Sequence, residues 1–387
     1  MSSSSIVSES ATAGPVGTAT KRLLSLDVFR GATIATMILV DDPGGADTYW
    51  PLRHAEWNGW TPTDLVFPFF LFIVGVAMAF SFNSRLQRGE SRQQLFGHVL
   101  WRGLALFALG MFLNGFPNHY HLATWRVYGV LQRIALCYVM TAILALWSDY
   151  RGWLVAATVC LAGYWILLRY MPVAGFGLPG RAVPLLDPDQ NLTAWLDRKL
   201  LFGHLYEGTR DPEGLLSSVP AVATCLSGLL TGHWLGSRYS AGKKVRAMLS
   251  VGIACVLLGE ISNVWLPINK KLWTSSYVLL TTGFALVSLA FCYWLFDMKR
   301  RKGPISKFFV IYGMNAIAAY VLAELLAIGL SVIPAGQGMS LQDYIYQLVF
   351  MPLASPPNAS LLFATTFTFV CWLPMWLLYR NRVFIKI

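Results

Sequence analysis

The chain has 387 residues, of which 56% are hydrophobic and only 13% are charged, and its mean hydropathy is +0.53. Soluble domains carry about a quarter of their residues as charges, so this composition excludes an ordinary soluble domain and indicates lipid as the solvent. The net charge of +11 is explained by lysines and arginines that anchor loops on the cytoplasmic side, so we do not expect nucleic acid as a partner.

The first twenty residues are rich in Ser, Thr, Ala and Gly and contain no basic stretch followed by an apolar core. We therefore expect residues 1–20 to be a disordered tail and not a signal peptide, and residues 21–387 to form one transmembrane domain. A helix that crosses a bilayer needs about twenty mostly apolar residues. Ten segments meet this requirement: 24–41, 65–82, 96–115, 127–147, 152–170, 215–236, 247–266, 274–296, 308–333 and 359–379. The predicted fold is all-α, a polytopic integral membrane protein with about ten transmembrane helices.

The orientation of these helices follows from the basic residues, which crowd around alternate helix ends. Because cytoplasmic loops carry an excess of Lys and Arg, we expect both termini inside. The larger polar segments, 42–64, 171–214 and 334–358, then face outward. The last of them contains an apolar stretch that is too short to span the bilayer, which suggests an interfacial or re-entrant helix.

The first outward segment carries the strongest candidate site. Its one imidazole is His54, a suitable general base because the ordinary pKa of histidine lies near 6.5. The surrounding polar residues are Asp41, Asp42, Glu56, Asn58 and Asp64. A neighbouring carboxylate could fix the tautomer of the histidine. The plainer interpretation is a surface histidine, with Asp64 serving only as a first-turn carboxylate of the second helix.

Several polar residues lie inside apolar runs or at their ends. Gln132 and Arg133 interrupt VYGVLQRIALCY, and Asn315 interrupts YGMNAIAAY; such groups need a cavity or a buried partner. Asp27 and Arg30 are three residues apart, which predicts a local ion pair. Glu213 stands at a helix start, where capping is the default. The six cysteines form no CxxC pair, and His119 and His121 lack a third ligand, so we expect neither a disulfide nor a metal site.

Taken in order, six blocks resemble the heparan-alpha-glucosaminide N-acetyltransferase family. They are RLLSLDVFRG (22–31), HAEWNGWTPTDLVFPFFLFIVG (54–75), GVLQR (129–133), DPEGLLS (211–217), INKKLWTSSYVL (268–279) and YGMNAI (312–317). The resemblance implies a membrane enzyme of ten or eleven helices, often a homodimer, that takes acetyl from cytoplasmic acetyl-CoA and delivers it to an amino sugar on the far side. It also implies that His54 is the catalytic histidine. The compact form suggests a bacterial relative in the inner membrane, with the His54 loop facing the periplasm.

The resemblance leaves specific points open. Where the family has Asn before the Gly-rich turn, this chain has Asp41 and Asp42, and an ionised Asp cannot donate a hydrogen bond. Asp42 could instead orient His54 or be protonated in a dry site. His54 could carry the acetyl group covalently or act only as a base. In either case a polar path must cross the bilayer.

We expect two groups of residues around that path. The acetyl-CoA side is predicted to comprise Gln132, Arg133, Asn269, Trp273 and Asn315, and the acceptor side Glu56, Asn58, Asp64 and Glu213. A close variant of this function would acylate a hydroxyl of an envelope glycan. The competing class is a transporter or flippase for a sugar or glycolipid, which needs no base at position 54 and does not bind CoA.

Overall fold

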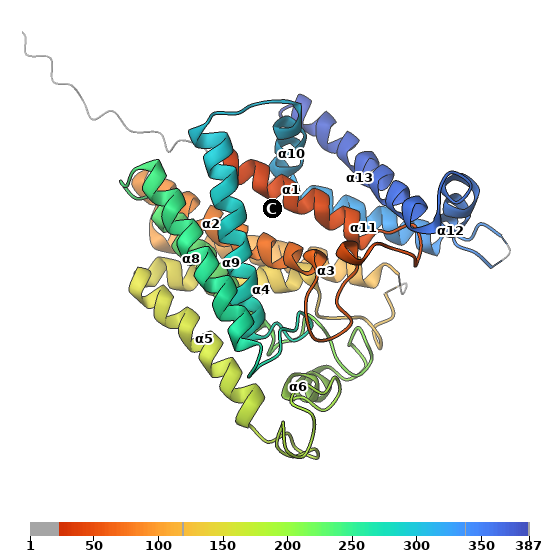
Figure 1. The fold of residues 1–387 in the computed structure, drawn as a ribbon, viewed down its shortest axis with the longest axis horizontal. Helices are drawn as coiled ribbons and strands as arrows, with labels where there is room; N and C mark the ends of the chain where they lie inside the picture. Colours follow the sequence, from red (N-terminus) through yellow and green to blue (C-terminus); the bar gives the residue numbers. More distant parts are fainter. Residues whose placement is uncertain (1–22, 118–119, 337, 386–387) are drawn as a thin grey trace, which may run out of the picture.

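The computed structural model describes residues 23–117, 120–336 and 338–385, so the predicted tail at 1–20 lies outside the described residues. The described residues form helices and no β-strand, which confirms the all-α prediction. The helices are α1 (Leu24–Asp41), α2 (Val66–Gln87), α3 (Arg92–Gly115), α4 (Val130–Trp147), α5 (Tyr150–Tyr170), α6 (Leu192–Leu201), α7 (Ser218–Leu235), α8 (Ala241–Ser262), α9 (Ser275–Cys292), α10 (Pro304–Met314), α11 (Ala316–Val332), α12 (Leu341–Ile345) and α13 (Pro356–Arg380). Figure 1 shows that α6 lies with long loops at one end of the bundle.

Each of the ten predicted segments coincides with a helix or a helix pair, yet the count of ten spans is not confirmed. Among the described residues, seven helices are long and apolar enough to cross a membrane, or eight if one bent pair is counted as a span. The predicted single helix at 308–333 is wrong. It consists of α10 and α11, which meet at an angle of 81° around Asn315. The chain is a polytopic integral membrane protein whose orientation stays a prediction.

The helix starts are set by local hydrogen bonds. Ser91 and Gln94 form a reciprocal capping box at the start of α3, and the Asp149 carboxylate accepts from the Gly152 amide at the start of α5. A 3₁₀ turn at Pro62–Leu65 leads into α2 and carries the same motif, with Thr61 and Asp64 as the pair. This last cap fixes the end of the loop that contains His54.

Two helix crossings depend on glycine. A Cβ atom on Gly75 of α2 would lie 1.9 Å from the Cys225 carbonyl oxygen of α7, and one on Gly31 of α1 would lie 1.7 Å from the Phe309 carbonyl oxygen of α10. Only the absence of a side chain permits such backbone contact, which is a common way to pack helices in membranes. These crossings hold α1 and α2, the two helices that flank the His54 loop, in the middle of the bundle.

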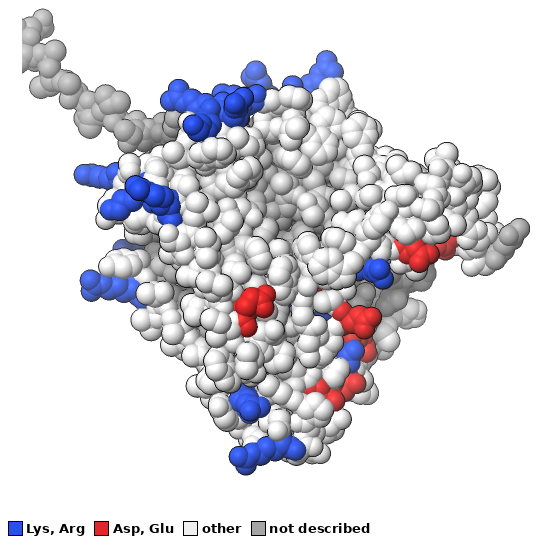
Figure 2. Space-filling model, in the orientation of Figure 1, with Lys and Arg blue, Asp and Glu red and all other residues white. Residues whose placement is uncertain are grey.

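Charge is unevenly distributed over the surface. Figure 2 shows Lys and Arg gathered over the end of the bundle where α9 ends and α10 begins, while Asp and Glu appear on the other part of the same face. Exposed Lys299, Arg300, Arg301 and Lys302 belong to the basic end. The His54 loop lies at the less basic end of the bundle, and the orientation in the membrane stays a prediction.

Candidate functional site

The loop between α1 and α2 is built around a buried carboxylate. Asp64 has no exposed surface, and its Oδ2 accepts hydrogen bonds from the amides of Ala55 and Thr61, each at 3.0 Å, and from the Thr61 hydroxyl at 3.1 Å. Its backbone carbonyl accepts from the Tyr277 hydroxyl. Asp64 therefore caps the helix start, as its position predicts, and at the same time ties the loop to α9 and leaves Oδ1 free to face His54.

His54 lies where four charged groups could meet. Its Nδ1 is 2.7 Å from Asp64 Oδ1 and its Nε2 is 3.5 Å from Asp41 Oδ1. The Lys270 ammonium group is 2.9 Å from the same Nδ1 and 3.4 Å from Asp64 Oδ1. The imidazole side chain is 44% exposed, so a solute at this end of the bundle can reach it. The structure thus brings together three of the residues that the sequence singles out and adds a fourth, Lys270.

The pKa values of two side chains in this region, His54 and Asp42, are shifted. Burial lowers the pKa of His54, but the hydrogen bonds to the Asp41 and Asp64 carboxylates outweigh it, and the net pKa is raised above its ordinary value. Asp42 lies among other acids. Burial first, and then the carboxylates of Asp41 and Glu324, raise the pKa of Asp42 to about 8. At neutral pH Asp42 is mostly protonated and can donate a hydrogen bond, as an asparagine would.

The remaining residues predicted for the acceptor side have varied surroundings. Glu56 and Asn58 are exposed, and the Asn58 side-chain oxygen accepts from the Asn269 amide at 3.2 Å. This contact places Asn269, predicted for the acetyl-CoA side, beside the acceptor residues. Glu213 pairs with Arg126 at 2.6 Å and belongs to an ion-pair cluster between loops.

Gln132, Arg133 and Trp273 are all about 1% exposed and are buried deeper in the bundle than the loop. The Arg133 guanidinium lies 5.0 Å from the centre of the Trp273 ring, and donates to the Ser217 hydroxyl and the Gly214 carbonyl oxygen. The Trp273 ring meets Phe67 edge-on, with 5.1 Å between the centroids. Together these side chains form a packed polar and aromatic layer beneath the His54 loop.

A cavity of about 680 Å³ lies on the other side of that layer. Its charged and polar lining comprises Asp27, Arg30, Ser81, Arg102 and Tyr138, and its deepest residues on α2 include Phe70. Phe70 is six residues from Asp64, a rise of about 9 Å along the helix. Asp27 and Asp41 stand at opposite ends of α1, a rise of about 21 Å. The cavity therefore begins at the basic end of the bundle and reaches towards the His54 site.

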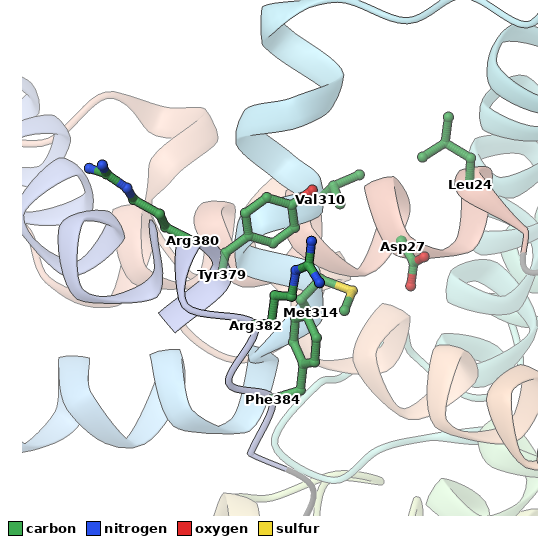
Figure 3. A pocket seen from close by; sticks show the side chains of 8 residues that line it. All are labelled: Leu24, Asp27, Val310, Met314, Tyr379, Arg380, Arg382 and Phe384. Carbon is green, nitrogen blue, oxygen red and sulfur yellow. The ribbon is translucent and has the colours of Figure 1, made fainter. Parts of the chain in front are cut away.

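A second cavity of about 570 Å³ adjoins the first and shares Asp27, Met314 and Phe384 with it. Figure 3 shows Arg382 gathered with Tyr379 and Met314, while Arg380 points away from them. The chain segment after α13 forms the wall between the cavities. The Asn315 side chain holds this segment, donating to the Val383 carbonyl oxygen at 3.2 Å and accepting from the Ile385 amide at 2.8 Å.

None of the five residues predicted for the acetyl-CoA side lines the larger cavity. Sequence reasoning interpreted Asp27 and Arg30 as a local ion pair, which is confirmed at 2.8 Å, and missed that the pair borders a cavity. The sequence did contain a signal for this cavity, since Arg30 and Arg102 are cations inside apolar runs. Sequence reasoning also missed Lys270, because a lysine near the end of a span is ordinarily an interface anchor.

Among the described residues, no group of three or more His, Cys, Asp or Glu side chains could hold a metal ion. His119 of the predicted pair lies outside the described residues. The six cysteines are free in the structure.

The fold and the site define a class: a helical integral membrane protein with a histidine between carboxylates at one end and an arginine-lined cavity at the other. The sequence model described as heparan-alpha-glucosaminide N-acetyltransferase, catalytic, matches residues 22–262. The human heparan-alpha-glucosaminide N-acetyltransferase is 31% identical over 360 residues, covering 78% of this chain and 52% of the human protein. The mouse protein is 31% identical over 366 residues, covering 79% of this chain and 54% of its own length.

The chain therefore belongs to the heparan-alpha-glucosaminide N-acetyltransferase family. It spans about half the length of the curated relatives that it matches. The matched region contains α1 to α8, and with them His54, Asp64 and Arg133, whereas Lys270 and Asn315 follow it.

Proposed function

We propose that this chain is a membrane-embedded acetyltransferase that moves acetyl from acetyl-CoA to the amine of a glucosamine-type sugar on the far side of the membrane. The observation that carries the proposal is the placement of His54. Its Nδ1 is hydrogen-bonded to the buried Asp64, while the ring remains open to solvent. This is the arrangement of a general base held in one tautomer by a carboxylate. Family membership supports acyl transfer as the chemistry.

The donor side of the proposal rests on the two cavities. CoA carries several phosphates, and Arg30, Arg102 and Arg382 lie around the cavities at the basic end of the bundle. Guanidinium groups are well suited to phosphate. The pantetheine arm would then extend along the larger cavity towards the layer of Arg133 and Trp273. These two residues remain our candidates for the inner path, together with Gln132, Asn269 and Asn315.

The acceptor side is acidic. Asp41 and Asp64 lie beside His54, and these carboxylates attract a cationic amine. The bound ammonium group first loses one proton to solvent. As the neutral nitrogen attacks the thioester carbonyl, His54 Nε2 receives a second proton. The C–N bond forms, the C–S bond breaks, and the proton held by His54 passes to the departing thiolate, so that CoA leaves as the thiol. The protonated Asp42 is our candidate to hold the carbonyl oxygen, and Glu56, Asn58 and Glu213 to contact the sugar.

The covalent alternative uses the same atoms in two steps. His54 Nε2 attacks the thioester first and carries the acetyl group, and the sugar amine then displaces it. Incubation with acetyl-CoA in the absence of acceptor, followed by peptide mass spectrometry of His54, distinguishes the routes. Accumulated acetyl-His54 that is chased by glucosamine supports the relay, and its absence during active turnover supports direct transfer.

The experiment that tests the function is transfer of radiolabelled acetyl from acetyl-CoA to glucosamine by the purified protein in detergent, beside His54→Ala. Transfer that disappears in the variant supports the proposal. If the folded protein neither transfers acetyl nor binds CoA, the acetyltransferase proposal is wrong and a transporter or flippase replaces it. Transfer to a hydroxyl acceptor instead of the amine would assign the glycan-acylating variant.

The surroundings of the enzyme are proposed from the resemblance and from the pattern of basic residues. We propose a bacterial inner membrane with both termini in the cytoplasm and the His54 loop in the periplasm, and a homodimer as the assembly. The apolar faces of α5 and α8 are mostly exposed, since only 17% of the most apolar window of each helix is buried, and they are available for lipid or for a second copy. Labelling of single engineered cysteines in loop 42–61 and in the segment before α10, from each side of sealed vesicles, tests the orientation.

A further inference from the structure

Lys270 contacts the candidate base directly, although neither the residue pattern nor the family match assigns it a role. Its Nζ is 2.9 Å from His54 Nδ1, 3.5 Å from His54 Nε2 and 3.4 Å from Asp64 Oδ1. Its side chain is only 23% exposed. The neighbouring Lys271 points elsewhere and pairs with Glu207 at 2.8 Å. The two adjacent lysines therefore differ in one respect that matters here, which is contact with His54.

The turn that carries Lys270 is rigid. The Asn269 side-chain oxygen accepts from the Leu272 amide at 2.9 Å, and the Trp273 amide donates to the Lys270 carbonyl oxygen at 3.0 Å. Trp273 has a left-handed φ of 52°, which is strained for a bulky residue, and its ring is fully packed in the core. The core thus holds the turn in a conformation that the backbone alone would not favour, and this conformation directs Lys270 at the imidazole.

The hydrogen-bond capacity of His54 permits two arrangements. A neutral imidazole has one N–H and one lone pair. If Nδ1–H donates to Asp64, Nε2 keeps its lone pair and Lys270 pairs with Asp64 Oδ1. If Nδ1 accepts from Lys270, the hydrogen lies on Nε2 and faces Asp41, and no base remains. A third state, the imidazolium, satisfies both carboxylates at once and is also inactive as a base.

We propose that Lys270 is a positioning residue of the transfer reaction: its ammonium group balances the carboxylates of Asp41 and Asp64, so that His54 Nε2 keeps its lone pair for the acceptor amine. The inference rests on the proposed function. The charged groups that face His54 are Asp41 from α1, Asp64 from the turn before α2 and Lys270 from the turn before α9, with Asp42 and Glu324 behind Asp41. Without Lys270 only acids face the imidazole.

The sign of the effect follows from these groups. The two carboxylates raise the pKa of His54 and the Lys270 charge lowers it. Removing the positive charge therefore raises the pKa further, and the neutral imidazole is lost at a higher pH. The acid limb of the activity profile moves to higher pH, while activity at alkaline pH is retained.

The test compares Lys270→Met and Lys270→Gln with Lys270→Arg and with the matched control Lys271→Met. Acetyl transfer is measured from pH 5.5 to 9, and each variant must elute as a single species and melt cooperatively. We expect both neutral Lys270 variants to be about tenfold less active than wild type at pH 6 and within about threefold at pH 9. Lys270→Arg and Lys271→Met should keep the wild-type profile shape. An unshifted acid limb, or a loss equal at every pH, would overturn the inference.

A second readout needs no turnover and separates this inference from the proposed function. Diethylpyrocarbonate modifies the neutral imidazole, so its rate of reaction with His54, followed by peptide mass spectrometry, reports the titration of His54 directly. The half-maximal rate should lie at higher pH in Lys270→Met than in wild type and Lys271→Met. If the curves coincide, Lys270 does not govern His54. If they differ but no variant transfers acetyl, the proposed function fails and the electrostatic role stands.

Discussion

Replacement of Asp64 by Asn tests the tautomer that the structure assigns to His54. In the wild type, Asp64 Oδ2 accepts three hydrogen bonds from Ala55 and Thr61, and Oδ1 faces His54 Nδ1 at 2.7 Å. An asparagine can keep its oxygen towards the two loop amides. Its NH₂ group then takes the position of Oδ1, and this group only donates. Nδ1 must accept, so the hydrogen of the neutral ring moves to Nε2, where the base is needed.

The size of the effect follows from the loss of the base. General-base catalysis contributes about 10²–10⁴-fold to rate, so kcat of Asp64→Asn should fall by about 10²–10⁴-fold. KM for glucosamine should change less than kcat, because Glu56 and Asn58, the exposed residues proposed to contact the sugar, are unchanged. The loop should stay folded, since the hydrogen bonds to the oxygen remain.

The assay measures kcat and KM for acetyl transfer, together with the melting temperature in detergent. Asp41→Asn is the comparison: its contact with Nε2 is 3.5 Å and its side chain is 41% exposed, so we expect a loss below about tenfold. If folded Asp64→Asn keeps kcat within about threefold of wild type, Asp64 does not fix the tautomer, and the assignment of His54 as the base is refuted.

Three further predictions concern the fold and its pH response. Gly75→Ala should destabilise the protein by about 1–3 kcal/mol or more, because its Cβ would meet the backbone of α7, whereas Gly97→Ala on α3, with open space around it, should be neutral or stabilising in a thermal melt. Arg126→Met breaks a largely buried pairing with two carboxylates and should cost about 3–5 kcal/mol. Arg85→Met at a more exposed pair should change the melting temperature much less, and equal effects would contradict the burial argument. Because the folded pKa of His54 is raised, the pH at which activity falls to half on acidification should lie above 6.5. The stability that the protonated ring contributes should be lost as the pH rises through that pKa.

The class of the protein could be predicted from composition and periodicity. The scarcity of charge and the ten apolar segments determine a helical membrane protein, because in lipid every backbone polar group must be satisfied within a helix. His54 and Asp64 could also be predicted to lie close together as candidate site residues, since both belong to the polar segment between the first two apolar helices. The sequence could not predict the break at Asn315, because α10 and α11 read as one continuous apolar run of spanning length.

What the sequence by itself determined was which segments are apolar enough to lie in lipid and which residues are candidates for chemistry, because both follow from side-chain type and local spacing. What only the tertiary structure decided was which of them meet. Lys270 follows His54 by more than two hundred residues, and its place beside Nδ1 depends on the packing of Trp273 in the core. The Asn315 side chain is hydrogen-bonded to Val383 and Ile385 of the C-terminal segment, at the bend of 81° between α10 and α11. Contacts between distant segments depend on how helices cross, and close crossings such as those at Gly31 and Gly75 are decided by three-dimensional fit.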